Sequence, residues 1–199
     1  MKKILLAVSF IVLAFANIDP TIQKAYYKSY NYEKMGDYKD AIKVLIPIYN
    51  RYPRGYTLNL RLGWLFYLSQ QYQNAIKHYK MASMVAPYSI EPKLGLMRVY
   101  NNMGNYDEAL KIGDLILKKD YYNFYGNYYE IIALKSKGDY KTALKITNKM
   151  LALYPTSILY LEQLGEIYNR LDRAKARVVF ENLLILDPNN IVAKEYLGK

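Results

Sequence analysis

Gly36-Asp37-Tyr38-Lys39-Asp40-Ala41 decides the fold, because this short turn followed by the start of a helix returns at regular intervals along the chain. Closely similar stretches begin at Gln70, Gly104 and Gly138. Their tyrosines lie at positions 38, 72, 106 and 140 and their alanines at 41, 75, 109 and 143, so each step is 34 residues. A fixed period of about this length predicts a solenoid of stacked helical hairpins.

The period divides the chain after a predicted linker, residues 17–21, into helical hairpins whose first helix is expected to begin at Ile22. Pro47 lies inside the second predicted helix and should bend it or interrupt its hydrogen bonds. The fifth hairpin is one residue shorter than the second between equivalent small residues, so its turn near Leu171 is predicted to lack one residue. The predicted units are residues 22–55, 56–89, 90–123, 124–157 and 158–189, followed by a capping helix in 190–199.

A fixed order of side-chain sizes accompanies the period: large, small, aromatic, small, aromatic, small and proline. The second hairpin shows this order at Leu62, Gly63, Phe66, Ala75, Tyr79, Ala82 and Pro87. The fifth hairpin nearly repeats it at Leu164, Gly165, Tyr168, Ala176, Phe180, Leu183 and Pro188. The order resembles that of the tetratricopeptide repeat family over residues 22–199. The resemblance implies an all-α, right-handed superhelical solenoid of about five hairpins, in which the first helix of each hairpin lines a concave groove.

The third and fourth hairpins depart from this order. Met97 and Gly113 stand at a small and an aromatic position, and Tyr121 replaces the usual proline. Because glycine within a helix costs on the order of 1 kcal/mol relative to alanine, this junction is expected to be the loosest. The tyrosine-rich stretch over residues 121–125 has two interpretations: it is an adhesive edge for a partner, or it fills the gap that the missing proline leaves.

The first 16 residues have the layout of a secretory signal peptide. Lys2 and Lys3 precede an apolar run from Ile4 to Phe15, and Ala14-Phe15-Ala16 provides small residues at the two positions that a signal peptidase inspects. This pattern predicts an exported protein, periplasmic or secreted, that begins at Asn17. The alternative is an uncleaved segment that anchors the protein in a membrane. The chain contains no cysteine, so disulfides and thiolate metal sites are excluded.

The chain is basic, with a formal net charge of +11. Removal of the predicted signal peptide leaves 26 basic and 17 acidic side chains, a net charge of +9. A basic surface attracts anionic partners, and predicted export argues against nucleic acid. One hypothesis is therefore that a basic, tyrosine-rich face binds an anionic glycan or a membrane surface. The other interpretation is that the charge serves solubility alone.

The resemblance implies that side chains on the first helices bind a protein or peptide partner in the groove. Aromatic residues and arginine suit such a surface, because they offer a large contact area with polar tips. Trp64, the one tryptophan, is the predicted main anchor; alternatively, neighbouring repeats cover Trp64 and Tyr67. The predicted ligand-binding residues are Tyr26, Tyr30, Leu60, Trp64, Tyr67, Arg98, Asn101, Asn102, Tyr125, Tyr128 and Lys135.

Candidate catalytic residues are few. Glu162 and Glu166 lie four residues apart on one predicted helix, a spacing that could suit acid–base work or a cation, but is common on solvated helices. His78 is the single histidine and has no acid or nucleophile near it in the pattern. We therefore expect no enzyme activity, cofactor, metal or small-molecule substrate. The leading hypothesis is a non-catalytic scaffold or adaptor of the cell envelope.

Overall fold

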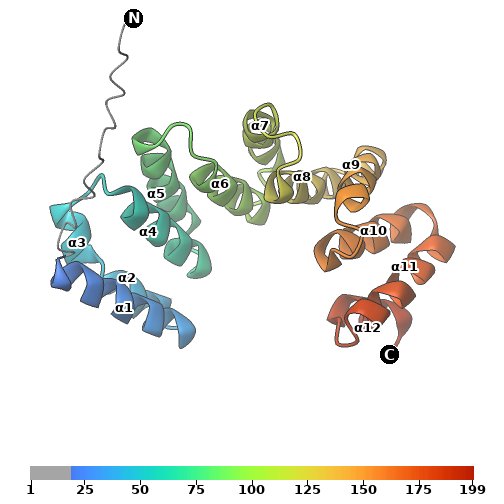
Figure 1. Ribbon diagram of the computed structural model, residues 1–199, viewed down its shortest axis with the longest axis horizontal. Helices are drawn as coiled ribbons and strands as arrows, with labels where there is room; N and C mark the ends of the chain where they lie inside the picture. The colour runs from blue at the N-terminus through green and yellow to red at the C-terminus, as the bar shows by residue number, and fades with distance from the viewer. Residues whose placement is uncertain (1–18) are drawn as a thin grey trace, which may run out of the picture.

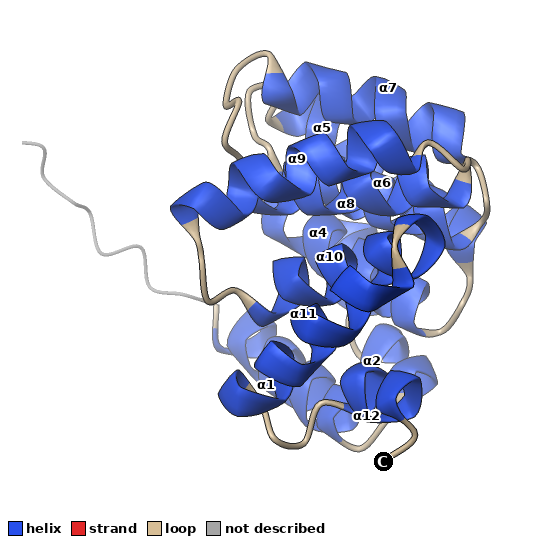
Figure 2. Cartoon of the chain, turned by 90° about the vertical axis from the view of Figure 1, so that its right-hand side faces the viewer, coloured by secondary structure: helices blue, strands red, loops and turns tan. Residues whose placement is uncertain are grey.

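The computed structural model describes residues 19–199; the predicted signal peptide lies outside them. Figure 1 shows the helices of this part arranged as a curved array, and Figure 2 shows no strand among them. The architecture is the predicted all-α, right-handed superhelical solenoid of helical hairpins. No helix in residues 19–199 is both long and apolar enough to span a bilayer.

Twelve helices make up the described part of the chain. The helices α5, α7 and α9 lie on the outer side of the array, and the first helices of the hairpins lie on its inner side (Figure 1). The helices are α1 (Pro20–Lys34), α2 (Tyr38–Lys43), α3 (Ile46–Arg51), α4 (Tyr56–Leu68), α5 (Tyr72–Val85), α6 (Glu91–Asn102), α7 (Tyr106–Leu117), α8 (Phe124–Ser136), α9 (Tyr140–Leu153), α10 (Ile158–Leu171), α11 (Arg173–Leu186) and α12 (Ile191–Leu197).

The first hairpin differs from the prediction at its start. Helix α1 begins at Pro20 rather than Ile22, so the predicted linker is wrong over its last residues. Asp19 caps the helix by accepting a hydrogen bond from the backbone N–H of Thr21 at 2.9 Å, and proline at a first helical position loses no hydrogen bond. The expected effect of Pro47 is confirmed, because the second helix is divided into α2 and α3 just before this residue.

The turns within the hairpins follow a common geometry until the last one. Gly36 adopts a left-handed conformation with φ 76°, and Gln70 adopts it without being glycine, at φ 59°. Between α10 and α11 a single residue, Asp172, ends one helix and caps the next by accepting from the N–H of Lys175 at 3.2 Å. The predicted shortening at this place is confirmed, but the turn has two residues fewer than the three between α4 and α5, because α10 continues one residue further.

In the second and fifth hairpins an aromatic ring fills the space above glycines. A Cβ atom added to Gly63 in α4 would lie 2.8 Å from the ring of Tyr79 in α5, and one added to Gly95 in α6 would lie 2.5 Å from it. The ring of Tyr79 therefore packs against glycines of two successive hairpins. Phe180 packs on Gly165 in the same way, with a distance of 2.5 Å. Glycine lets these helices approach closely enough to exclude water.

In the third hairpin the large and the small side chain of this contact exchange positions. Met97 is fully buried where the second hairpin has Gly63, and a Cβ atom on Gly113 would lie 2.9 Å from Cε of Met97. The methionine thus fills the space that the missing aromatic ring of this hairpin would occupy. The loose junction was predicted from Gly113 alone. Because Met97 fills the space beside this glycine, the structure does not support that prediction.

The two kinds of glycine should respond oppositely to alanine. We expect Gly113→Ala to raise the free energy of unfolding by up to about 1 kcal/mol, because the neighbouring methyl group ends a flexible side chain and alanine favours the helix. We expect Gly165→Ala to lower it by about 1–3 kcal/mol, because the ring of Phe180 is also held by Tyr196 and cannot move aside. Urea denaturation of both variants measures the difference, and equal signs would contradict this packing.

Side chains in the first helices also hold the loops between hairpins. Asn59, Lys93 and Asn127 lie 34 residues apart, and each donates two hydrogen bonds to backbone oxygens four and six residues earlier. The donor–acceptor distances range from 2.7 Å for Lys93 to 3.0 Å for Asn127. We call these residues the loop clamps. Because buried backbone oxygens need donors, the clamps fix the loop conformation.

His78 is a structural residue that the first loop clamp holds. Both N–H groups of the Asn59 amide are used by the loop, so its Oδ1 atom must accept from Nδ1 of His78 at 2.8 Å. The imidazole stacks on Phe66 with ring centroids 5.2 Å apart. Burial, with a smaller contribution from Lys77, lowers the pKa of His78 from 6.5 to about 4. The folded protein therefore favours the neutral ring.

This preference predicts a loss of stability in mild acid. Because the pKa of His78 is lower in the folded than in the unfolded protein, its contribution is complete above pH 6.5 and is lost as the pH falls toward about 4. Thermal melting between these pH values should show Tm falling more steeply in the wild type than in His78→Gln, which keeps an N–H donor for Asn59. Parallel curves for the two proteins would show that another group causes the decline.

Candidate binding groove

Three hollows follow one another along the first helices. The N-terminal hollow has a volume of about 570 Å³ and lies between α1, α4 and the start of α6. The central hollow, between α4, α6 and α8, has about 400 Å³, and the C-terminal hollow, between α8, α9 and α10, about 290 Å³. The array of helices thus carries a segmented groove.

Ten of the eleven predicted ligand-binding residues line these hollows. Tyr125 does not; half of its surface is exposed, and it stacks on Tyr129. The N-terminal hollow contains Tyr26, Tyr30, Leu60 and Trp64. The central hollow contains Tyr67, Arg98, Asn101, Asn102 and Tyr128, and the C-terminal hollow contains Lys135.

Contacts between successive first helices join many of the groove side chains. Residues 31 positions apart meet repeatedly: Trp64 Nε1 donates to Oε1 of Glu33 at 2.6 Å, and Lys135 forms an ion pair with Glu166. The guanidinium carbon of Arg98 lies 5.6 Å from the ring centroid of Tyr67, the residue 31 positions before it. The groove surface is therefore preorganised, since neighbouring repeats hold these side chains.

Arg98 is the best-defined element of the central hollow. Its guanidinium carbon lies 4.7 Å from the centroid of the Trp64 ring and 5.5 Å from that of Tyr129, and its Nε atom donates to the hydroxyl of Tyr129 at 2.8 Å. Burial raises the pKa of Tyr129, an effect that Arg98 partly offsets. Among the described residues, the terminal nitrogens of Arg98 have no acceptor. They can bind a ligand oxygen.

Asn101 lines the same hollow and helps to hold its wall in place. Its Nδ2 atom donates to the backbone oxygen of Tyr129 at 2.9 Å, which fixes the orientation of the amide. The Oδ1 atom is buried and has no hydrogen-bond partner in the described residues. Because this atom is closed off from solvent, a bound molecule cannot reach it in this conformation, and the clear role of Asn101 is to hold the backbone of Tyr129 beside Arg98.

Trp64 is partly covered by neighbouring repeats and partly available in the groove, so each of its two predicted interpretations applies in part. Its ring is only half-buried, stacks on Tyr67 with centroids 5.6 Å apart and carries Arg98 on its surface. Neighbouring repeats thus cover part of it, while part still lines the N-terminal hollow. Trp64 shapes the groove as well as offering contact area.

Two buried residues of the groove were missed from the sequence. Arg61 is 7% exposed, pairs with Glu33 and stacks on Tyr30 at 3.7 Å from the ring centroid. Tyr129 is also 7% exposed and positions Arg98. Both lie at the same position of their hairpins, 68 residues apart, which is two periods. No repeated polar signal marks this position, because residue 95, one period from each of them, is glycine.

The candidate carboxylate pair does not form a common site. Glu162 accepts from Nδ2 of Asn190 at 2.6 Å, whereas Glu166 pairs with Lys135. Each carboxylate has a separate structural partner in a neighbouring element. This arrangement supports the interpretation of a helix surface over that of an acid–base pair.

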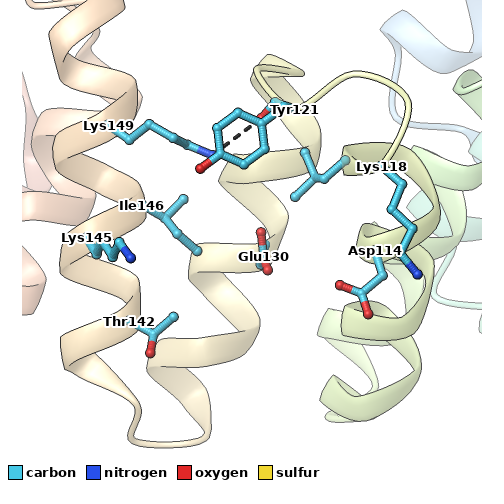
Figure 3. Close-up of a pocket in the computed structure, with 9 residues that line it drawn as sticks. Asp114, Lys118, Tyr121, Glu130, Thr142, Lys145, Ile146 and Lys149 are labelled. Atoms are coloured by element: carbon cyan, nitrogen blue, oxygen red, sulfur yellow. Dashed lines mark hydrogen bonds between the residues drawn. The ribbon is translucent and has the colours of Figure 1, made fainter.

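A further cavity, of about 580 Å³, lies outside the groove between α7, α8 and α9. Figure 3 shows Glu130 between the helices, with Lys149 directed toward the ring of Tyr121. Glu130 stands where the second and fifth hairpins have leucine, and burial raises its pKa. Glutamate at this position lines the cavity with a polar group where leucine would make an apolar contact. The sequence pattern did not predict this cavity.

Comparison with solved structures shows the fold. TTC0263, a thermophilic TPR protein in Thermus thermophilus, has a TM-score of 0.73 and 14% identity over 88% of this chain and 97% of its own. MamA 41-end from Desulfovibrio magneticus RS-1 has a TM-score of 0.71 and 16% identity over 86% and 97% of the two chains. The fold is therefore that of tetratricopeptide repeat proteins.

Sequence comparison is less extensive. No family model matches the chain. Two curated relatives, ER membrane protein complex subunit 2-A of Xenopus laevis and ER membrane protein complex subunit 2 of Xenopus tropicalis, are each 33% identical over 92 residues. The matched region is 46% of this chain and 31% of each relative, so the chain spans about a third of the length of the curated relatives it matches.

Proposed function

We propose that the protein is a non-catalytic scaffold of the cell envelope that holds an extended segment of a partner protein in its groove. The main support is the central hollow. There Arg98 is held between aromatic rings with its terminal nitrogens available. Carbonyl oxygens recur along an extended peptide backbone, so a peptide can supply the acceptor that these nitrogens lack.

The groove also offers contact area on either side of this polar centre. Tyr26, Tyr30 and Trp64 line the N-terminal hollow, and Tyr128 lines the central one. The residues that contribute most to the energy of a protein interface are commonly tryptophan, tyrosine and arginine. The proposed place in the cell envelope depends on the signal peptide pattern of residues 1–16.

The test is capture of partners from the protein's own cells with the full chain carrying Trp64→Ala and Arg98→Ala. We expect binding of the specific partner to weaken at least about a hundredfold, because truncation of two central anchors removes most of an interface's affinity. The matched control is Tyr27→Ala with Arg177→Ala, an aromatic residue and an arginine that line none of the three hollows. Mass spectrometry identifies what is captured.

Circular dichroism and thermal melting must show that the groove variant keeps its helices, since Trp64 also bonds Glu33. If the folded groove variant retains its partner, the groove is the wrong face. If binding instead falls steeply with salt and is insensitive to Trp64, the basic, tyrosine-rich surface is the binding face.

A further inference from the structure

The two edges of the solenoid differ in the apolar side chains they expose. We define the loop edge as the five connections between hairpins, residues 52–55, 86–90, 118–123, 154–157 and 187–190, with one residue on either side. The turn edge consists of the turns within hairpins, with the same margin. The turn edge exposes two large apolar side chains, Met35 and Leu171. The loop edge exposes nine: Tyr52, Val85, Tyr88, Tyr121, Tyr122, Leu153, Tyr154, Leu186 and Ile191.

Tyrosine dominates the loop edge and is exposed well beyond what packing requires. Tyr88 is 87% exposed, Tyr121 59% and Tyr122 51%. Tyr121 therefore does more than fill the gap left by the missing proline. Rings with this exposure contribute little to the core, so their accumulation on one edge indicates a surface that binds another molecule.

A basic side chain accompanies most of these rings. The guanidinium carbon of Arg51 lies 5.2 Å from the ring centroid of Tyr52. The ammonium nitrogen of Lys119 lies 5.0 Å from that of Tyr88, and Lys149 approaches Tyr121 to 3.8 Å. Exposed Lys118 adds a further charge. Basic side chains thus accompany the rings of the first three connections, whereas residues 153–158 and 186–191 contain none.

The loop clamps keep this surface in place. Lys93 binds two backbone oxygens of the loop that carries Tyr88, and Asn127 binds two of the loop that carries Tyr121. Ordered loops present their rings without first losing conformational freedom, which lowers the cost of binding.

We propose that the loop edge is the surface by which the protein lies on an anionic lipid bilayer. Tyrosine is enriched where proteins meet the membrane–water interface, and lysine and arginine are attracted to anionic headgroups. Leu153, Leu186 and Ile191 extend the edge with aliphatic side chains, which suit a bilayer better than a glycan. The groove is a separate surface, so this proposal does not depend on the proposed partner.

The start of the described chain supports the same orientation. Asp19 lies beside the end of α3, where its carboxylate accepts from Arg51 at 3.1 Å. The chain therefore enters the fold at the loop edge. If the apolar run from Ile4 to Phe15 anchors the protein, it attaches on this side of the solenoid.

The test uses fluorophores attached to single cysteines, which the chain lacks. Thr156→Cys places the reporter on the loop edge and Asn105→Cys places it on the turn edge, both at exposed positions. The full chain is mixed with vesicles of phosphatidylcholine, with and without phosphatidylglycerol. We expect the emission to shift toward that of an apolar environment only for position 156 and only on the anionic vesicles.

Charge reversal then tests the basic residues. Lys118→Glu with Lys119→Glu should weaken partitioning onto the anionic vesicles about 25-fold or more, since each basic residue near such a surface contributes about fivefold. Lys39→Glu with Lys141→Glu makes the same charge change at exposed positions near the turn edge and should alter partitioning by less than about twofold. The N-terminal segment is identical in all variants and cannot cause these differences.

Equal emission shifts at positions 105 and 156, or none at 156, would overturn the proposal. So would a shift at 156 that requires an acidic polysaccharide instead of vesicles, or one that appears with protein concentration alone and indicates a second copy. None of these variants changes Trp64 or Arg98, so failure here leaves the groove experiment unaffected.

Discussion

Tyr79→Ala is expected to lower the free energy of unfolding by about 3–5 kcal/mol, as for other buried aromatic truncations. The ring is 4% exposed and fills the space above both Gly63 and Gly95. Neither glycine has a side chain that could occupy the cavity. The loss should therefore affect the contact within the second hairpin and the contact between the second and third hairpins, and urea denaturation measures it.

The control is Tyr79→Phe, which keeps the ring. The described residues give the Tyr79 hydroxyl no hydrogen-bond partner, so we expect a change within about 1 kcal/mol. In a solenoid, loss of one interface can also separate the unfolding of the flanking repeats. A loss below about 1 kcal/mol in Tyr79→Ala, or a large loss in Tyr79→Phe, would show that the ring does not fill this space.

The hairpins could be predicted from the sequence because the turn residues and the order of side-chain sizes are both local features. Turn residues such as Gly36 mark helix ends, and the size order at Gly63, Ala75 and Tyr79 describes packing inside one hairpin. The missing residue near Leu171 and the interruption at Pro47 are also local effects. The error at the start of α1 arose because Pro20 was assigned to the linker, although proline favours the first turn of a helix.

The groove could be predicted only in outline. Which face lines it follows from the resemblance, but the contacts of Trp64 with Glu33 and of Lys135 with Glu166 depend on the rotation between successive hairpins. No pattern within one repeat specifies that rotation. The loop clamps did leave a signal, because Asn59, Lys93 and Asn127 all carry N–H donors and lie one period apart. Their acceptors are backbone oxygens, which a side-chain pattern cannot show.

Arg61 illustrates how a groove residue can also be essential to stability. Its Nη2 atom donates to the hydroxyl of Ser29 at 3.1 Å, and Nη1 pairs with Glu33. We expect Arg61→Ala to lower the free energy of unfolding by about 3–5 kcal/mol, because it leaves a half-buried carboxylate without its cation. The result should appear in urea denaturation as a lower midpoint with a similar slope.

A double variant separates the loss of the pair from the loss of packing. In Arg61→Met with Glu33→Leu, no charge is left unpaired, and methionine retains much of the volume beside Tyr30. We therefore expect this variant to recover most of the stability lost in Arg61→Ala, although the indole N–H of Trp64 loses its acceptor. If the double variant is no more stable than Arg61→Ala, the contribution of Arg61 comes from its contacts with Ser29 and Tyr30 rather than from pairing with Glu33.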